Sequence, residues 1–167
     1  MKTPGTWFLL ATGALHAVVL AAIAPGLPER VPTHFGIGGG ADAWGSRSEV
    51  LWMFGLVSAG ILVLFLLITL AMGKIPVSLI NAPNKDWWIA TPERETLMRR
   101  RMASDMNVFG GATMLLVTLL TVDTARAATT ADPRTGWATH LGLIGYLLFT
   151  VAFVVWMFVH RFARGEE

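Results

Sequence analysis

The fold class of this chain follows from one run of residues, Gly60-Ile-Leu-Val-Leu-Phe-Leu-Leu-Ile-Thr-Leu-Ala71. The run lies inside Val50–Gly73, a stretch of 24 residues that contains no Asp, Glu, Lys or Arg. The hydrocarbon core of a bilayer is about 30 Å thick, and a helix that rises about 1.5 Å per residue crosses it with roughly 20 apolar residues. The run therefore predicts a membrane-spanning helix.

Three further stretches carry no formal charge: Thr3–Pro28 with 26 residues, Met106–Val122 with 17 and Thr135–His160 with 26. The stretch of 17 is short for a span, but Thr91-Pro92 ahead of it has the residues of a helix N-cap and first turn. A helix that begins there enters the membrane already formed, with its basic side chains extended toward the headgroups. The sequence thus predicts four spans.

We therefore predict an all-α integral membrane protein, a single domain over residues 1–167 that forms a bundle of four transmembrane helices. The spans are expected at about 6–26, 50–72, 104–123 and 137–160, with outer loops at 27–49 and 124–136 and a cytoplasmic loop at 73–103. A cleaved signal peptide is the alternative for the first span, because Lys2 and Ala22-Ile-Ala24 resemble its ends. Against this alternative, Pro25 would follow the cleavage site.

The composition agrees with a membrane protein and excludes several classes of function. Apolar residues make up 54% of the chain, charged residues 14%, and the mean hydropathy is +0.57, whereas an average soluble domain is about 25% charged. With no cysteine, the chain has no disulfide, thiolate metal site or thiol nucleophile. The formal net charge of +2 is too small to indicate a nucleic acid partner, and no cofactor is expected.

The distribution of Lys and Arg predicts the orientation of the helices, because cytoplasmic loops carry an excess of both. With both termini in the cytoplasm, nine basic residues face the cytoplasm and four face the outside. The nine are Lys2, Lys74, Lys85, Arg94, Arg99, Arg100, Arg101, Arg161 and Arg164, and the four are Arg30, Arg47, Arg126 and Arg134. We therefore predict a multi-pass protein with its N-terminus and C-terminus inside.

The first outer loop is typical of a small hairpin that covers the outer end of the bundle. Val31 precedes a proline, which keeps it out of the helical region, so Val31–Phe35 suits an extended strand. Gly36–Gly40 is turn or loop. The chain then returns toward the membrane through Ala43–Gly45, where the amphipathic ring of Trp44 suits the interface.

Small residues that permit close contact between helices recur at intervals of four. They are Gly13, Ala17 and Ala21 in the first span, Gly55 and Ala59 in the second, and Ala138 and Gly142 in the fourth. Gly110-Gly111 supplies flexibility or a notch in the third span. We expect these positions to serve packing within the bundle rather than a dimer face.

Two segments carry a resemblance to a known family. The first is Leu27-Pro-Glu-Arg-Val-Pro-Thr-His-Phe-Gly36 with Gly40-Ala-Asp-Ala-Trp-Gly-Ser46, and the second is Asn81-Ala-Pro-Asn-Lys-Asp-Trp-Trp88. Both resemble a bacterial membrane domain of unknown function (family 1648 type), which is also found at the N-terminus of SdpI-like toxin-immunity proteins. The resemblance implies a location in the bacterial inner membrane. Gly38-Gly-Gly40 replaces the more polar turn that is common in the family.

The outer loop holds the side chains that we expect to bind an extracytoplasmic ligand or partner: His34, Phe35, Asp42 and Trp44. A histidine beside the membrane can titrate, bind a metal or form a hydrogen bond. His34 and His140 are weak metal candidates, because they lie at the same end, but their spacing matches no metal motif and we predict no metal site. The alternative for His34 is a structural hydrogen bond within the hairpin.

On the inner side, the second signature is expected to bind a cytoplasmic or membrane partner. The residues predicted to do so are Asn81, Pro83, Asn84, Lys85 and Trp87. The alternative is an interfacial turn that indole rings hold at the membrane surface, where tryptophan is enriched.

Two further sets of polar residues are candidates. Arg99, Arg100 and Arg101 are predicted to contact lipid, because basic residues are attracted to an anionic membrane surface. Specific phosphate recognition is the alternative, although no glycine-rich phosphate loop accompanies them. His16 lies near the middle of the first span, where a polar group usually faces the bundle interior, so it serves either packing or function. No Asp or Glu in the charge-free stretches offers it a partner for proton relay.

These observations favour a small bacterial inner-membrane protein of SdpI-like type that is not an enzyme. We expect it to sense or neutralise an extracytoplasmic agent, or to relay a signal inward. Its predicted partners are the lipid bilayer and either an extracytoplasmic peptide or toxin or another membrane protein. The alternatives are an accessory subunit of a larger membrane complex, and a membrane metal-binding protein or enzyme that uses His34 and His140.

Overall fold

The computed structural model describes residues 2–163, which form four long helices, a two-stranded hairpin and several short turns. The long helices are α1 (Pro4–Ile23), α2 (Arg47–Met72), α4 (Pro92–Ala128) and α5 (Trp137–Trp156). The hairpin pairs β1 (Arg30–Phe35) with β2 (Ala41–Ser46), and α3 (Lys85–Trp88) is a single turn. The short turns are η1 (Ala24–Gly26), η2 (Val77–Leu79) and the π-helical η3 (Met157–Arg161). Arg164, one of the nine basic residues above, lies outside the described residues.

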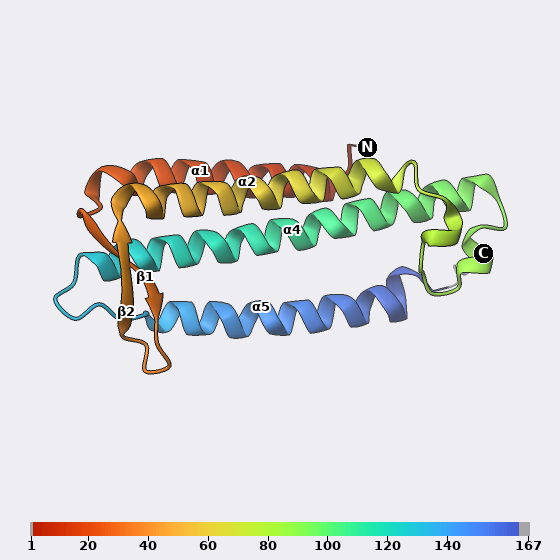
Figure 1. Ribbon diagram of the computed structural model, residues 1–167. Helices are drawn as coiled ribbons and strands as arrows, with labels where there is room; N and C mark the ends of the chain where they lie inside the picture. The colour runs from red at the N-terminus through yellow and green to blue at the C-terminus, as the bar shows by residue number, and fades with distance from the viewer. Residues whose placement is uncertain (1, 164–167) are drawn as a thin grey trace.

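Helix α4 is the centre of the bundle. It packs against α1, α2 and α5, and α1 also packs against α2. Figure 1 shows α4 running between the α1–α2 pair and α5. The hairpin lies at one end of the helices and α3 at the other, so His34 and Lys85 are at opposite ends, as a four-span chain requires.

Three of the long helices begin with a side-chain N-cap. Thr3 accepts a hydrogen bond from the amide of Thr6 at the start of α1. Ser46 and Glu49 form a capping box at α2, in which each side chain accepts from the other residue's backbone amide. Thr91 accepts from the amide of Arg94 and confirms the predicted helix start. From there α4 continues for 37 residues without a break.

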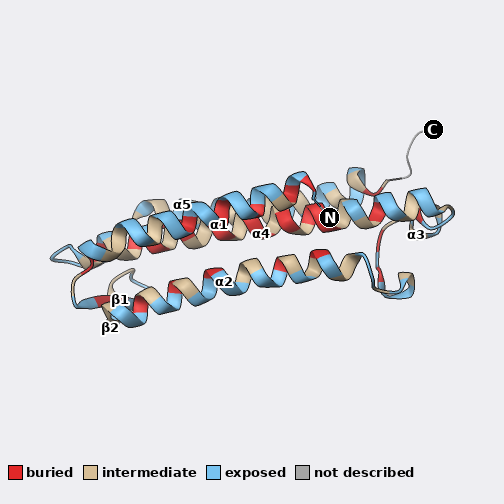
Figure 2. Ribbon diagram, turned by 90° about the horizontal axis from the view of Figure 1, so that it is seen from above, coloured by how far each residue is buried: buried red, intermediate tan, exposed pale blue. Residues whose placement is uncertain are grey.

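Burial in the bundle is reversed relative to a soluble protein. The exposed side chains of α2 and α5 are mainly large and apolar, whereas several buried side chains in the bundle are polar. Figure 2 shows exposed positions along the whole length of α2. The buried hydroxyls of Thr12, Thr69 and Thr118 each donate to the carbonyl four residues earlier, which satisfies them without water. This arrangement suits lipid as the surrounding solvent.

Four helical segments in the described part of the chain are long and apolar enough to span a membrane. They are Pro4–Gly26, Arg47–Met72, Pro92–Ala128 and Trp137–Arg161. The prediction of a helical membrane bundle is therefore confirmed at the level of length and composition.

The glycine pair of the third span forms a notch in a continuous helix. A Cβ added at Gly110 would lie 2.6 Å from the ring of Phe65 in α2. A Cβ added at Gly111 would lie 2.5 Å from the ring of Phe8 in α1. Both distances are below any normal carbon–carbon contact, so glycine is what lets two phenyl rings reach the backbone of α4.

The small residues of α1 and α2 only partly serve close packing. A Cβ added at Gly13 would lie 2.8 Å from the side chain of Leu62 in α2. Around it, however, a cavity of about 440 Å³ opens between the two helices, and Gly55 has no neighbour where a Cβ would stand. The small residues that were predicted to pack α1 against α2 therefore line, in part, a groove between these two helices. In α5, Gly142 packs against Leu119 of α4, as expected for bundle packing.

Candidate functional site

The hairpin at one end of the bundle holds the predicted outer residues in a fixed register. Val31 pairs with Gly45 and Pro32 with Trp44, and the register then shifts on either side of His34, which lies opposite Ala43. Val31 is fully buried and packs in a cluster with Leu27, Val50 and Phe54. This cluster holds the hairpin against the ends of the helices, and the polar residues of the hairpin face outward.

His34 and Asp42 form an exposed ion pair across the hairpin. The two atoms Nδ1 of His34 and Oδ1 of Asp42 are 2.5 Å apart, with side-chain exposures of 68% and 53%. An ionised carboxylate only accepts, so Nδ1 of His34 donates and its Nε2 faces solvent free to bind a further group. The predicted structural hydrogen bond of His34 is present, and it leaves one ring nitrogen available.

The other predicted residues of the outer set lie beside this pair. The guanidinium of Arg30 stands 4.9 Å from the ring centroid of Trp44, a cation–π contact on the surface of the hairpin. Phe35 is half-buried and pairs with Ala41. Ile37 is fully exposed at the tip. The hairpin therefore presents an ion pair, an indole and an apolar tip.

The hairpin tip is joined to the loop between α4 and α5. The amide of Ala41 donates to the carbonyl of Pro133 at 3.0 Å, and the amide of Thr135 donates to the carbonyl of Gly39 at 2.9 Å. Gly39 has φ of 77°, a conformation that favours glycine. These bonds join the segment between α1 and α2 to the segment between α4 and α5.

Asp123 holds the start of α5 in place. It was not identified as a site residue from the sequence. Its Oδ2 accepts from the amide of Gly136 and from the hydroxyl of Thr139, both at 2.7 Å. Its Oδ1 accepts from Nε of Arg126 at 2.9 Å. In the sequence, a carboxylate at the end of a charge-free stretch indicates only where a span ends. The pattern does not show that this carboxylate binds Thr139, 16 residues later.

His140 does not join His34 and Asp42 in a metal site. Its Nδ1 lies 3.0 Å from the carbonyl oxygen of Gly136, one turn earlier in the chain. Within residues 2–163, no group of three or more His, Asp or Glu side chains has an arrangement that could hold a metal ion. The two weak metal candidates, His34 and His140, are thus not brought together.

The second signature, at the other end, mainly holds the end of α5. Nδ2 of Asn84 and Nε1 of Trp88 both donate to the carbonyl of Phe162, at 3.1 and 3.3 Å. Trp88 is buried in a cluster with Ile80, Met98 and Phe162. These contacts agree with a structural role for this turn, which was the alternative to partner binding.

The remaining residues of the predicted inner set are more accessible. Trp87 lies under the guanidinium of Arg94, 4.2 Å from the ring centroid. Lys85 donates to the carbonyl of Ser78 at 3.4 Å. Asn81 is exposed and, with Pro83, lines a small cavity beside the end of α5. Partner binding by this set stays a prediction.

The arginine triplet divides into three different environments. Arg99 donates to Glu95 and to the carbonyls of Met72 and Ile75 at the end of α2, with only 14% of its side chain exposed. Arg101 is half-buried, and Arg100 alone is exposed. The lipid-contact prediction is therefore revised for Arg99, which closes the last turn of a neighbouring helix instead.

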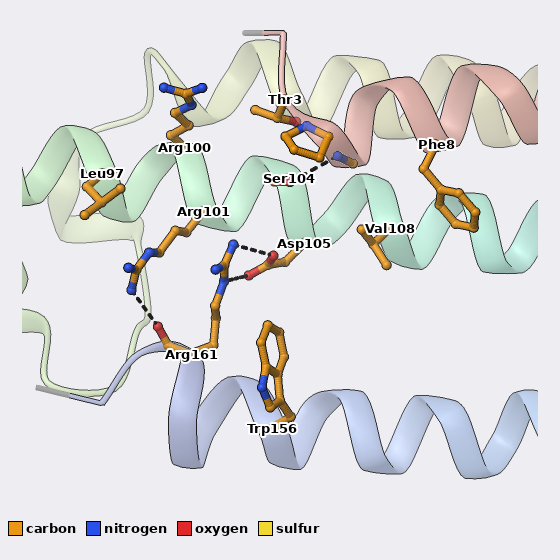
Figure 3. Close-up of a pocket in the computed structure, with 12 residues that line it drawn as sticks. Thr3, Phe8, Leu97, Arg100, Arg101, Ser104, Asp105, Val108, Trp156 and Arg161 are labelled. Atoms are coloured by element: carbon orange, nitrogen blue, oxygen red, sulfur yellow. Dashed lines mark hydrogen bonds and ion pairs between the residues drawn. The ribbon is translucent and has the colours of Figure 1, made fainter. Parts of the chain in front are cut away.

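A cleft of about 490 Å³ opens between α1, α4 and α5 at this end (Figure 3). Inside it, Asp105 of α4 accepts two hydrogen bonds from Arg161, at 2.9 and 3.1 Å. Asp105 is almost fully buried, and Arg101 donates to the carbonyl of Arg161. Sequence reasoning missed this ion pair because Asp105 marked the edge of a charge-free stretch. In the structure both Asp105 and Asp123 lie within the continuous helix α4.

Two buried polar residues hold the helices together between the ends. Nδ2 of Asn107 donates to the hydroxyls of Thr6 in α1 and Thr69 in α2, at 3.0 and 2.8 Å. His16 is buried, with Nδ1 3.1 Å from the hydroxyl of Thr118. That hydroxyl already donates to Met114, so His16 is the donor. The contacts support packing as the role of His16.

The fold and the pattern of burial define a multi-pass helical membrane protein. A family model described as a domain of unknown function (DUF1648) matches residues 11–58 of the chain. The match covers most of α1, the hairpin and the first half of α2, and it confirms the resemblance seen in the first signature. The second signature lies outside it. Searches of curated proteins and of solved structures gave no significant match.

Proposed function

We propose that this is a non-enzymatic bacterial inner-membrane protein of SdpI-like type, with both termini in the cytoplasm and the hairpin outside. The hairpin recognises an extracytoplasmic agent such as a peptide toxin and neutralises it or relays its presence inward. The observation that carries this proposal is the pair of backbone hydrogen bonds between the hairpin tip and the α4–α5 loop.

The surface of the hairpin suits recognition of a peptide. The free Nε2 of His34 and the half-exposed carboxylate of Asp42 offer one donor or acceptor and one acceptor side by side. Ile37 and Trp44 add apolar contact at the tip and on the adjoining strand. A mixed polar and apolar surface of this kind provides both hydrogen bonds and burial of apolar area to a bound peptide.

The route inward runs through α5. This helix packs along α4, and its first turn is fixed by Asp123 and by the loop that the hairpin holds. An agent that moves the hairpin therefore changes the position of α5 relative to α4. Arg161 and Phe162, which follow α5 at the far end, carry that displacement to the cytoplasmic side.

The test compares two double variants at the same end of the bundle. Cells that express the wild-type chain, H34A/W44A or W52A/M53A at equal membrane levels are exposed to a panel of secreted bacterial peptide toxins. We expect survival to fall to that of cells without the protein in H34A/W44A and to stay at the wild-type level in W52A/M53A, since Trp52 and Met53 are exposed residues of α2 that lie outside the hairpin and outside α5. Full protection by H34A/W44A would exclude the hairpin from the mechanism.

An accessory subunit of a larger membrane complex is the second candidate. It is favoured by α5, whose apolar window has none of its residues buried within the protein. Purification in mild detergent distinguishes the two, because a subunit retains its partner whereas the proposed sensor is recovered alone or as a homo-oligomer.

A further inference from the structure

We propose that the cleft between α1, α4 and α5 binds one anionic phospholipid, with its phosphate at the arginines and an acyl chain along the apolar wall. The cleft lies at the end opposite the hairpin, so this site is independent of the recognition surface proposed above.

The charges that line the cleft favour an anion. Among the described residues that line the cleft, Arg100, Arg101 and Arg161 contribute three guanidinium groups, and Asp105 is the single carboxylate. Both oxygens of Asp105 are taken by Arg161, at 2.9 and 3.1 Å. Two positive charges therefore remain without an acidic side chain on the cleft wall. An anionic headgroup is the ligand that complements them.

The arginines have different roles in this arrangement. Arg101 is held in place, because it donates to the carbonyl of Arg161 and stands 5.2 Å from the ring centroid of Trp88. Arg100 is exposed and extends from α4 in another direction (Figure 3). A headgroup at the mouth is thus contacted by the fixed guanidinium of Arg101, and the exposed Arg100 adds a positive charge at the rim.

Beyond the arginines, the cleft is lined mainly by apolar residues of the candidate spans. Phe8 of α1, Val108 of α4 and Trp156 of α5 line it from three sides. These residues continue the cleft from the arginines along the helices, which is the direction of an acyl chain in a bilayer. A soluble phosphate compound would leave this wall uncovered, so charge and shape together select an amphiphile.

The cleft exists because α1 and α5 pack on different sides of α4. At this end α1 approaches α4 closely, since the amide of Gly5 donates to the hydroxyl of Ser104 at 3.2 Å. The Asp105–Arg161 pair holds the end of α5 against α4 on the other side. Both walls are therefore fixed, and the cleft does not depend on a ligand to keep it open.

Native mass spectrometry of the full chain in detergent tests the proposal. Phosphatidylglycerol and phosphatidylcholine with identical acyl chains are the two lipid probes, and inorganic phosphate is the soluble competitor. We expect one retained phosphatidylglycerol per chain, no comparable retention of phosphatidylcholine, and no displacement by phosphate. Equal retention of the two lipids, or displacement by phosphate, would overturn the assignment.

Three variants locate the site. R100Q/R101Q is expected to bind phosphatidylglycerol roughly thirtyfold more weakly, because one basic residue at an anionic surface corresponds to roughly a fivefold change in affinity. The matched control K74Q/R94Q removes two charges from the same end but none from the residues that line the cleft, and it should bind as wild type. V108W fills the apolar wall without changing charge and should also lose the lipid.

The outcomes separate a defined site from general attraction to acidic membranes. An equal loss in R100Q/R101Q and K74Q/R94Q, or wild-type binding by V108W, would show surface attraction only and overturn the proposal. Circular dichroism and thermal unfolding of each variant establish that the bundle is intact. If V108W is misfolded, F8W, which changes another wall of the cleft, takes its place with the same expectation.

Discussion

The two ends of this bundle differ in how they use charge. At the hairpin end, the ion pair of His34 and Asp42 is exposed and leaves atoms free for contact with other molecules. At the arginine-rich end, Asp105 is buried and both its oxygens are occupied by Arg161. An exposed pair contributes little to stability but is available for binding, whereas a buried pair fixes the helices and becomes costly when broken. This difference is consistent with the recognition that we propose for the hairpin end, and it shows that the other end holds Arg161, which follows α5, against α4.

Breaking the buried pair should have the largest effect. D105L leaves the Arg161 guanidinium in the cleft without its carboxylate, and we expect a loss of about 3–5 kcal/mol in the free energy of unfolding, as for other buried pairs that lose one partner. Equilibrium unfolding in detergent measures it. D132L is the control, because Asp132 pairs with Arg134 at an exposed site and should change stability little. Similar losses in both variants would contradict the contrast between the ends.

Asp123 should show an intermediate effect. D123A removes the acceptor for the amide of Gly136 and the hydroxyl of Thr139, and we expect a loss of about 1–3 kcal/mol. Hydrogen exchange of the first turn of α5 should rise in this variant, while exchange at Phe162 stays unchanged. Uniform exchange along α5 would mean that Asp123 does not fix its outer end.

The exposed pair of the hairpin should have the smallest effect on stability. D42N weakens the contact with His34, and we expect less than about 1 kcal/mol of change in the free energy of unfolding. In the protection assay, however, the same variant should lose activity. A large destabilisation with activity retained would reverse the roles assigned to the two ends.

The helices and the hairpin could be predicted from the sequence because their signals are local. Charge-free length marks the spans, Thr91-Pro92 marks the start of α4, and Val31-Pro32 with the glycines marks the strand and turn. Each signal is contained within a few residues or within one continuous run. The family match to residues 11–58 agrees with the hairpin segment in particular.

The contacts that hold the bundle could not be predicted in the same way. Asp105 and Arg161 are 56 residues apart, and neither stands out from other charges at the edge of a span. Arg99 looked like a lipid contact because its neighbours are basic, yet its direction on α4 aims it at the end of α2. Helix direction and tertiary packing decide such pairs, and a single sequence shows neither.

The most direct test of the account uses the absence of cysteine from the chain. I37C places one thiol at the exposed hairpin tip, and S78C places one beside the second signature at the other end. A membrane-impermeant thiol reagent is added to intact cells that express each variant. The account predicts that I37C is labelled at once and that S78C is labelled only after the membrane is opened. Labelling of both thiols in intact cells, or of S78C alone, would contradict it.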